Sequence, residues 1–299
     1  MPNIRRILAG VAGRAFGRLL GGLEIGDLTW LARNLHTDRD AENAVALAKF
    51  SKAYHDIFYR NSSGDIRANG ELRLLQRLSG LPMKVALDVG ANIGNWTAAI
   101  KAAEPSIEVH AFEIVPDTAR QMRQNIAGLN GIHLNEFGLG EAATEIEISF
   151  SPDNNVLSSA IEARRAEFPD LKDSWRTIRG KLLPGDDYVA QNRIEHVDFL
   201  KIDVEGMEMK VLSGFDRTFA RAAIDIVQFE YAPLNKFIPL LLREFHDFFR
   251  SREFAVGKVY PKGVDFKEYE TDDEDFVGLT YIACRSDRKD LIERIGYHR

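Results

Sequence analysis

Four acidic residues follow apolar stretches of the sequence, at positions where a bound ligand could be recognised. In an open parallel sheet, ligands bind beyond the carboxyl ends of the strands. Acids at the ends of neighbouring strands would therefore share one edge of the sheet, and we expect them to form a binding site rather than four unrelated surface charges. The four acids are Asp88, Glu113, Asp203 and Glu230.

The first acid precedes a loop with widely spaced glycines. Asp88 is followed by Gly90, Asn92 and Gly94, and this pattern predicts a strand, a tight loop with an open backbone, and a helix. Dinucleotide-binding loops instead read Gly-x-Gly-x-x-Gly. A carboxylate beside the loop would repel a pyrophosphate but suits a cationic ligand such as S-adenosylmethionine (SAM). The alternative is an ordinary corner between a strand and a helix.

Glu113 is the second candidate for cofactor binding. It stands roughly 20 residues beyond the glycine loop, where an acid at the end of the second strand can accept both ribose hydroxyls. NAD would satisfy the same position, so a dehydrogenase is an alternative. The missing third glycine and the early Asp88 favour SAM.

Asp203, Glu205 and Glu230 are the candidates for catalysis. Asp203 and Glu205 follow a later strand, close to where SAM would present its methyl group. Methyl transfer is an in-line displacement that depends on alignment, and a hydroxyl acceptor must also lose its proton to a base such as a carboxylate. Alternatively, Asp203 orders the turn and Glu205 caps the helix that starts at Met207.

The sequence does not indicate a metal site. Nearby acids could hold a divalent cation that activates a sugar diol, but nothing in their spacing requires one. The histidines and the single cysteine show no ligand spacing. We expect His110, His196 and His246 to be structural or solvated.

Apolar runs alternate with helical patterns from Lys84 onward, which predicts an α/β fold with a mainly parallel sheet. The last two strands are joined without a helix, which suggests an antiparallel edge strand. A further strand is expected over residues 144–150, and residues 151–185 are expected to form a long, irregular, polar insertion. The seven strands expected in the sheet are residues 85–89, 107–112, 132–137, 197–202, 224–229, 254–260 and 276–284.

Two regions follow from this pattern, namely an N-terminal helical cap over residues 1–80 and an α/β domain over residues 81–299. A helix is expected over residues 41–58, and Asn69-Gly70-Glu71 opens another over residues 72–78. We expect this helical region to be a cap before the first strand and not a separate catalytic unit.

The composition is that of an ordinary cytoplasmic protein. A net charge of −6 argues against broad nucleic-acid binding, and a single cysteine excludes an internal disulfide. No apolar stretch approaches the roughly 20 residues that span a bilayer. The N-terminus is basic and amphipathic, with Ile4, Ile7 and Leu8 at helical spacing beside Arg5 and Arg6, so it could lie on an anionic membrane surface or pack on the domain.

Several motifs resemble the FkbM family of SAM-dependent methyltransferases. The most specific is Lys-Ile-Asp-Val-Glu-Gly at residues 201–206. The resemblance covers roughly residues 69–284 and implies a class I methyltransferase (Rossmann-like) fold and, usually, O-methylation of hydroxyls in glycans, glycolipids or polyketides. The other matching segments are residues 88–95, 112–113, 198–200, 207–208, 211–214, 228–230, 259–264 and 274–276.

The resemblance also implies roles for individual residues. Asp88, Gly90, Asn92 and Glu113 match the SAM-binding positions, and the cap residues Asn69 and Glu71 are possible helpers. Residues 1–60 and much of 151–185 fall outside the pattern and would then determine the substrate.

Three functions remain open from the sequence. The first is O-methylation of a sugar hydroxyl, with a small molecule or glycan as acceptor. N-methylation is disfavoured because residues 203–206 contain no proline to clamp a planar nitrogen. The third is a SAM-binding module without catalysis, which the intact acids disfavour. The oligomeric state is not indicated.

Overall fold

A computed structural model describes residues 13–35, 42–60, 63–151, 154–159, 174–238, 240–277 and 279–297. For residues 43, 59, 60 and 154–159 only the backbone is described. The chain divides into two compact units, Met1–Phe58 and Tyr59–Arg299. The contacts of residues 59–80 therefore lie mainly with the α/β unit.

The described part of the first unit is mainly helical. A helix over residues 13–20 is followed by α2 (Ile25–Leu35) and α3 (Glu42–His55), and a π-helical turn (Asp56–Arg60) continues α3 across the boundary between the units. The first turns of the expected N-terminal amphipathic helix lie outside the described residues. Among the helices that are described, none is both long enough and apolar enough to cross a bilayer.

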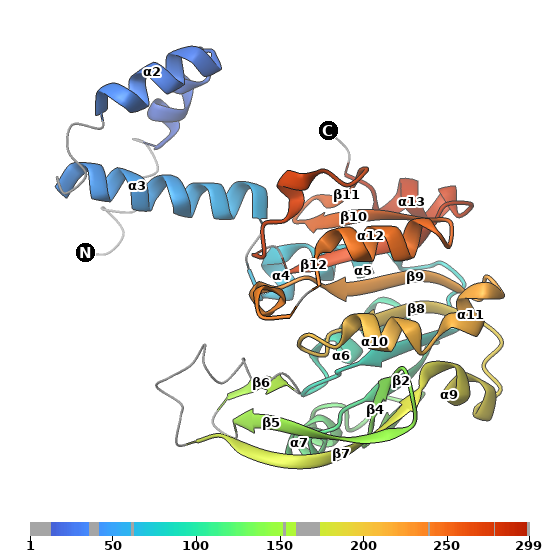
Figure 1. Cartoon of the computed structure of the whole chain (residues 1–299). Helices are drawn as coiled ribbons and strands as arrows, with labels where there is room; N and C mark the ends of the chain where they lie inside the picture. Colours follow the sequence, from blue (N-terminus) through green and yellow to red (C-terminus); the bar gives the residue numbers. More distant parts are fainter. Residues whose placement is uncertain are drawn as a thin grey trace. The chain divides into compact units, whose positions relative to one another are not determined.

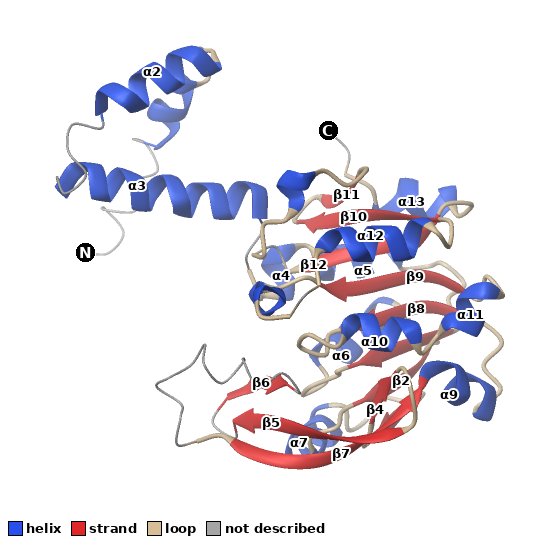
Figure 2. Cartoon of the chain, in the orientation of Figure 1, coloured by secondary structure: helices blue, strands red, loops and turns tan. Residues whose placement is uncertain are grey.

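The second unit is built on a large sheet, shown in Figures 1 and 2. Its described strands run in the order β11-β10-β12-β9-β8-β1-β2-β3. The strands are β1 (Val85–Val89), β2 (Glu108–Phe112), β3 (Ile132–Asn135), β8 (Val197–Ile202), β9 (Ile224–Glu230), β10 (Phe254–Tyr260), β11 (Gly263–Phe266) and β12 (Thr280–Arg285).

The pairing of these strands is mainly parallel. Strands β3, β2, β1, β8 and β9 are parallel, whereas β12 is antiparallel to both β9 and β10, and β11 is antiparallel to β10. The expected α/β fold is confirmed. Two details differ: the antiparallel β12 lies inside the sheet rather than at its edge, and the short β11 adds an eighth strand to the seven that were expected.

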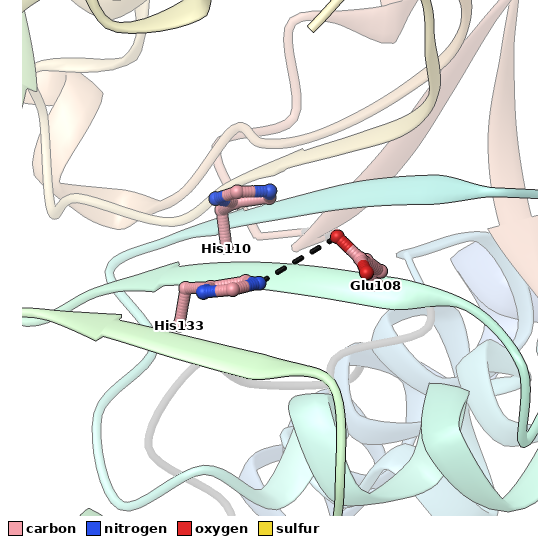
Figure 3. Close-up of side chains that lie close together, drawn as sticks. All are labelled: Glu108, His110 and His133. Carbon is pink, nitrogen blue, oxygen red and sulfur yellow. Dashed lines mark ion pairs between the residues drawn. The ribbon is translucent and has the colours of Figure 1, made fainter. Parts of the chain in front are cut away.

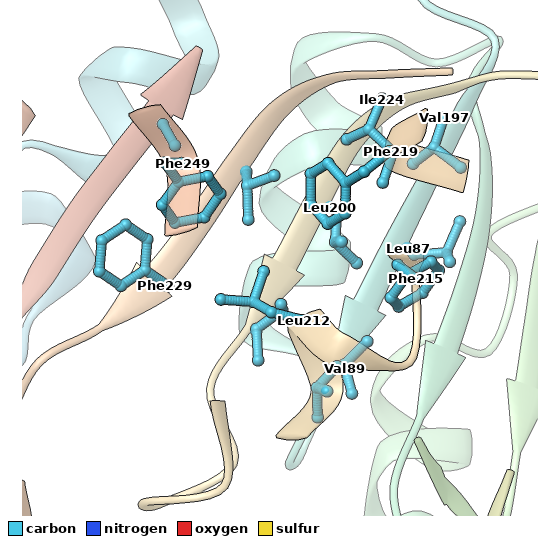
Figure 4. Packing of buried hydrophobic residues seen from close by; sticks show 14 of the residues in the cluster. Leu87, Val89, Val197, Leu200, Leu212, Phe215, Phe219, Ile224, Phe229 and Phe249 are labelled. Carbon is cyan, nitrogen blue, oxygen red and sulfur yellow. The ribbon is translucent and has the colours of Figure 1, made fainter. Parts of the chain in front are cut away.

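Helices cover both faces of the sheet because successive residues of a strand point to opposite faces. Leu87 packs in the larger core with residues of α9, α10, α11 and α12, as Figure 4 shows for part of that cluster. Ala86, its neighbour, packs in the second core with residues of α5, α6 and α13. The helices of this unit are α4 (Ile66–Asn69), α5 (Glu71–Leu78), α6 (Asn95–Ala103), α7 (Pro116–Asn125), α9 (Gly185–Gln191), α10 (Glu208–Ser213), α11 (Asp216–Ala220), α12 (Leu242–Arg250) and α13 (Lys289–Ile295).

A second, smaller sheet occupies part of the segment that was expected to be irregular. Its described strands run in the order β4-β7-β5-β6, and β7 pairs antiparallel with β5 from Thr144↔Leu182 to Phe150↔Arg176. The expected strand over residues 144–150 is confirmed, but the expectation of irregular structure is wrong for residues 154–159 and 176–184. Polar side chains on one face of β7 made this strand look like a loop. The strands are β4 (Gly138–Gly140), β5 (Thr144–Ser151), β6 (Asn154–Ser159) and β7 (Arg176–Pro184).

Candidate functional site

An open cavity of about 260 Å³ lies beyond the carboxyl ends of β1, β8 and β9. Six of the nine predicted site residues line this cavity. The other three, Asp88, Gly94 and Glu113, do not line it and instead support the residues that do. The six are Glu71, Gly90, Asn92, Asp203, Glu205 and Glu230, and Asn69, Trp96, Lys201, Gln228 and Thr280 also contribute to the lining.

The glycine loop is shaped by a contact between two backbones. Gly90 has φ +80°, and a Cβ built on it would lie 1.8 Å from the carbonyl oxygen of Asp203. Only glycine therefore lets the loop after β1 lie against the loop after β8. Gly94, with φ +86°, is the residue from which α6 begins.

Glu113 stabilises the glycine loop by accepting hydrogen bonds from the backbone. Its Oε2 accepts a hydrogen bond from the backbone N–H of Asn92 (2.9 Å), and its Oε1 accepts one from Val115 N–H (2.7 Å). Burial raises the pKa of Glu113 to about 7. In this geometry the carboxylate fixes the position of Asn92. The predicted contact with a ribose stays a prediction.

Asp88 is fully buried, and its charge is used within the protein. Thr97 Oγ1 donates a hydrogen bond to Oδ2 (2.6 Å), and the ammonium group of Lys201 lies 3.3 Å from Oδ1. Asp88 thus joins β1, α6 and β8 beneath the loop.

Lys201 is a site residue that the sequence analysis did not single out. Its Nζ lies 3.2 Å from Asp203 Oδ2 as well as close to Asp88. Burial alone would lower the pKa of Lys201, but the carboxylates of Asp203, Asp88 and Glu71 raise it above its usual value, so the ammonium stays charged. The signal in the sequence is a lysine inside a buried apolar strand, because such a charge must be paired.

The turn after β8 is organised by Glu208. Its carboxylate accepts hydrogen bonds from Val204 N–H (3.1 Å) and Gly206 N–H (3.2 Å), and burial raises its pKa to about 7. Glu205 takes a left-handed conformation (φ +54°) in this turn. The Glu208 carboxylate thus orders the turn that places Asp203 and Glu205 at the cavity.

Glu71 is the centre of a polar network at the cavity wall. Its carboxylate accepts hydrogen bonds from Asn69 Nδ2 (2.5 Å), Gln228 Nε2 (2.7 Å) and Thr280 Oγ1 (3.2 Å). Trp96 Nε1 donates to Gln228 Oε1 (3.3 Å). The sequence analysis assigned no role to Gln228 or Thr280. Gln228, like Lys201, is a polar residue inside a buried and mainly apolar strand, and such a residue must find a polar partner.

The cavity is acidic. Among the described residues that line it, four carry carboxylates and one, Lys201, carries a positive charge. An anionic concave surface raises the local concentration of positively charged ligands. The donor set therefore fits the ammonium and sulfonium groups of SAM better than a pyrophosphate.

A family model described as the methyltransferase FkbM domain matches residues 88–256. The chain belongs to this family. The match begins at Asp88 and includes the glycine loop, Glu113, the turn after β8 and β9. The fold is accordingly that of a class I methyltransferase.

Individual relatives of this FkbM-family chain are distant. Methyltransferase 1 of Beauveria bassiana is 27% identical over 143 residues, which are 44% of this chain and 57% of the relative, so the matched part falls short of two thirds of that protein. The 31-O-demethyl-FK506 methyltransferase FkbM of Streptomyces tacrolimicus is 26% identical over 206 residues (58% and 74%). The hexuronic acid methyltransferase AglP of Haloferax volcanii is 28% identical over 180 residues (58% and 70%).

Proposed function

We propose that this chain transfers the methyl group of SAM to a hydroxyl of a sugar in a surface glycan, a glycolipid or a natural product. The observation that carries the proposal is the position of Asp203 and Glu205 in the cavity that the glycine loop also lines. A methyl donor and a candidate base would then face the same acceptor. The name of the FkbM relative, an O-methyltransferase, supports a hydroxyl acceptor, and the name of AglP supports a sugar.

The residues have distinct roles in this reaction. SAM supplies a methyl group bound to a positively charged sulfur. Glu71, Gly90 and Asn92 bind this cofactor, with Glu113 as the predicted ribose partner. The acceptor oxygen forms its bond to the methyl carbon as the bond between that carbon and sulfur breaks, and a carboxylate, that of Asp203 or Glu205, takes the hydroxyl proton.

Glu230 is a third candidate base. It is the last residue of β9 and lines the same cavity. The base is therefore identified by comparing the turnover of Glu230→Gln with that of Asp203→Asn and Glu205→Gln. None of these assignments requires a divalent cation.

The first unit has features that support contact with a membrane surface. Its described helices expose large apolar side chains, including Ile25 (84% exposed), Trp30 (65%) and Phe50 (56%). Basic side chains accompany them at Arg18 and Lys49. A helix with exposed apolar and basic residues can lie in the interface of an anionic bilayer, where a glycolipid acceptor would be found. Sedimentation with anionic vesicles, compared with neutral ones, tests this part of the proposal.

Calorimetric titration with SAM, with its demethylated product and with NAD tests the cofactor. We expect binding of the first two compounds. Binding of NAD without binding of SAM would overturn the proposal. Mass spectrometry of surface glycans and small metabolites from cells with and without the active protein then identifies the acceptor, as one species that differs by one methyl group.

Variants separate catalysis from cofactor binding. Asp203→Asn and Glu205→Gln should keep SAM affinity, and the variant of the base should lower turnover by about 10²–10⁴-fold. Glu141→Gln, at an exposed acid outside the cavity, is the matched control. Loss of SAM binding in both site variants would assign these acids to the cofactor instead, and N-methylated products would favour the N-methyltransferase alternative.

A further inference from the structure

Two histidines and a glutamate gather on one face of β2 and β3, at a distance along the strands from the cofactor cavity. His110 of β2 and His133 of β3 are direct partners in the parallel register. Glu108 lies two residues before His110, so its side chain points to the same face. Because Glu108 is the first residue of β2, the group lies toward the amino end of the strand, whereas the cavity lies beyond the carboxyl ends.

The three side chains are close enough to share a ligand. The imidazole rings are stacked, with centroids 4.5 Å apart and planes inclined by 18°. His133 Nε2 lies 3.6 Å from the Glu108 carboxylate. One donor atom from each residue can be chosen so that all three lie within 4.8 Å of one another. Figure 3 shows the Glu108 carboxylate on the side toward which both rings present a nitrogen.

A hydrogen-bond chain fixes the orientation of His110. Its Nδ1 lies 2.8 Å from the hydroxyl of Tyr188, and Asn135 Nδ2 donates to the same hydroxyl (3.1 Å). When Nδ1–H donates to Tyr188, the lone pair of Nε2 faces the other two side chains. Histidines that bind metals usually donate their second N–H in this way, and the contact holds the tautomer and the ring.

We propose that Glu108, His110 and His133 form a binding site for a divalent cation of the zinc type. Two imidazole nitrogens and one carboxylate oxygen are ligands that Zn²⁺ accepts, whereas Mg²⁺ and Ca²⁺ prefer oxygen ligands throughout. Tetrahedral zinc brings its ligand atoms to about 3.3 Å from one another. Glu108 and His133 are exposed and can rotate to close the remaining gap of up to about 1.5 Å, and water can supply the fourth ligand.

A second group of similar composition serves as a contrast. His196, Asp198 and Asp225 also lie within reach of one ion, but their carboxylates are already engaged. Asp225 is ion-paired with Arg288 and Arg285, and Asp198 accepts two backbone N–H groups. Two guanidinium groups beside the ligands would repel a cation. We therefore propose no cation site at His196, Asp198 and Asp225.

The proposed ion would tie strand β3 to its neighbour β2. In the described part of the sheet, β3 is the last strand on its side and pairs with β2 alone, so a bridge between His110 and His133 stabilises an edge. The ion would not touch SAM. The sequence analysis predicted no metal cluster because the two histidines stand far apart in the chain, and parallel strand pairing brings them together.

Zinc chloride titrated by calorimetry into the chelator-treated full chain, without an affinity tag, tests the proposal. We expect one ion per chain with micromolar or tighter affinity, and a higher melting temperature with zinc. His133→Ala and Glu108→Gln should each weaken binding by about 10-fold or more, while His196→Ala should bind zinc like the native chain. Both test variants replace exposed side chains, and urea unfolding verifies that they fold.

The affinity for SAM should be the same in all of these variants, so this test is independent of the proposed methyl transfer. Absence of saturable one-to-one binding would overturn the proposal. Equal zinc affinity in His133→Ala and the native chain would also overturn it. Magnesium chloride in place of zinc should give no heat of binding, and a response to magnesium equal to that to zinc would contradict the assigned ligand chemistry.

Discussion

Lys201 and Asp88 face each other across neighbouring strands, with 3.3 Å between the ammonium nitrogen and Oδ1 of the carboxylate. The two residues are also register partners in the parallel pair of β1 and β8. The pairing of β1 with β8 thus places Lys201 beside Asp88, which precedes the glycine loop. The same ammonium group lies 3.2 Å from Asp203. One buried cation, Lys201, therefore orients both Asp88, which lies before the glycine loop, and Asp203, a candidate base.

Replacing Lys201 by methionine should destabilise the protein strongly. Asp88 is fully buried and would lose its counter-charge, and breaking a buried pair in this way costs about 3–5 kcal/mol. Lys210→Met is the control, because Lys210 and Glu141 form a pair 3.7 Å apart in which both side chains are more than half exposed. Such a pair contributes about 0–1 kcal/mol. Urea unfolding measures both, and equal losses would contradict the role given to Lys201.

Gly90→Ala should weaken cofactor binding at least tenfold through its effect on the backbone. The new Cβ would collide with the carbonyl oxygen of Asp203 and force the two loops apart. Gly80→Ala is a matched control, since Gly80 has the same φ of +80° and nothing lies within 4 Å of its Cβ position. The control should lose about 1–2 kcal/mol of stability from the left-handed conformation alone. Calorimetric titration should show native SAM affinity for Gly80→Ala and at least a tenfold loss for Gly90→Ala.

The contribution of Glu113 and Glu208 to the stability of the fold should fall as the pH rises from about 4.5 to about 7. Burial raises the pKa of Glu208 to about 7, and that of Glu113 likewise, from the ordinary value of 4.5. Across this window the folded chain keeps protons that the unfolded chain has lost, so the free energy of unfolding decreases with pH. Urea unfolding at a series of pH values gives the free energy of unfolding as a function of pH. This free energy should fall less steeply with pH in Glu208→Gln than in the native chain. An equal pH dependence in the two proteins would mean that Glu208 does not titrate in this window.

Thr280→Val should weaken the cavity wall without unfolding the protein. Thr280 Oγ1 donates to the Glu71 carboxylate, and a hydrogen bond to a charged group contributes about 1.5–3 kcal/mol. Thr144→Val is the control, because the Thr144 hydroxyl donates to a backbone carbonyl on the surface. We expect a loss of stability and of SAM affinity in Thr280→Val only. A loss of stability with native SAM affinity would limit Glu71 to a structural role.

Much of the central sheet could be predicted from the sequence. Strands β1, β8 and β9 are buried on both faces and are therefore mainly apolar in sequence, and their predicted limits agree with the structure to within one residue. Strand β11 was missed because it has only four residues, Gly263–Phe266, with Asp265 among them. Strand β7 was missed because its polar face resembles a loop.

The site was predicted less completely than the fold. Position in the sequence identifies the acids at the strand ends, but it does not say what each carboxylate contacts. Asp88 and Glu113 were expected to face the cofactor, but in this structure they contact protein groups: Thr97 and Lys201 for Asp88, and backbone N–H groups for Glu113. Their roles toward SAM stay predictions. Lys201 begins the most specific motif of the sequence, but its pairing with Asp88 and Asp203 depends on the arrangement of the strands and was not predicted.

The position of β12 has a consequence for the order in which parts of the protein can fold during synthesis. This strand leaves the ribosome after every other strand of the sheet, yet it lies between β9 and β10. Until it arrives, the edge of β9 is open to pairing with another chain, and Glu71 lacks its contact with Thr280. The nascent chain therefore acquires its cofactor pocket late, when residue 280 joins the sheet, and needs protection of this open edge until then.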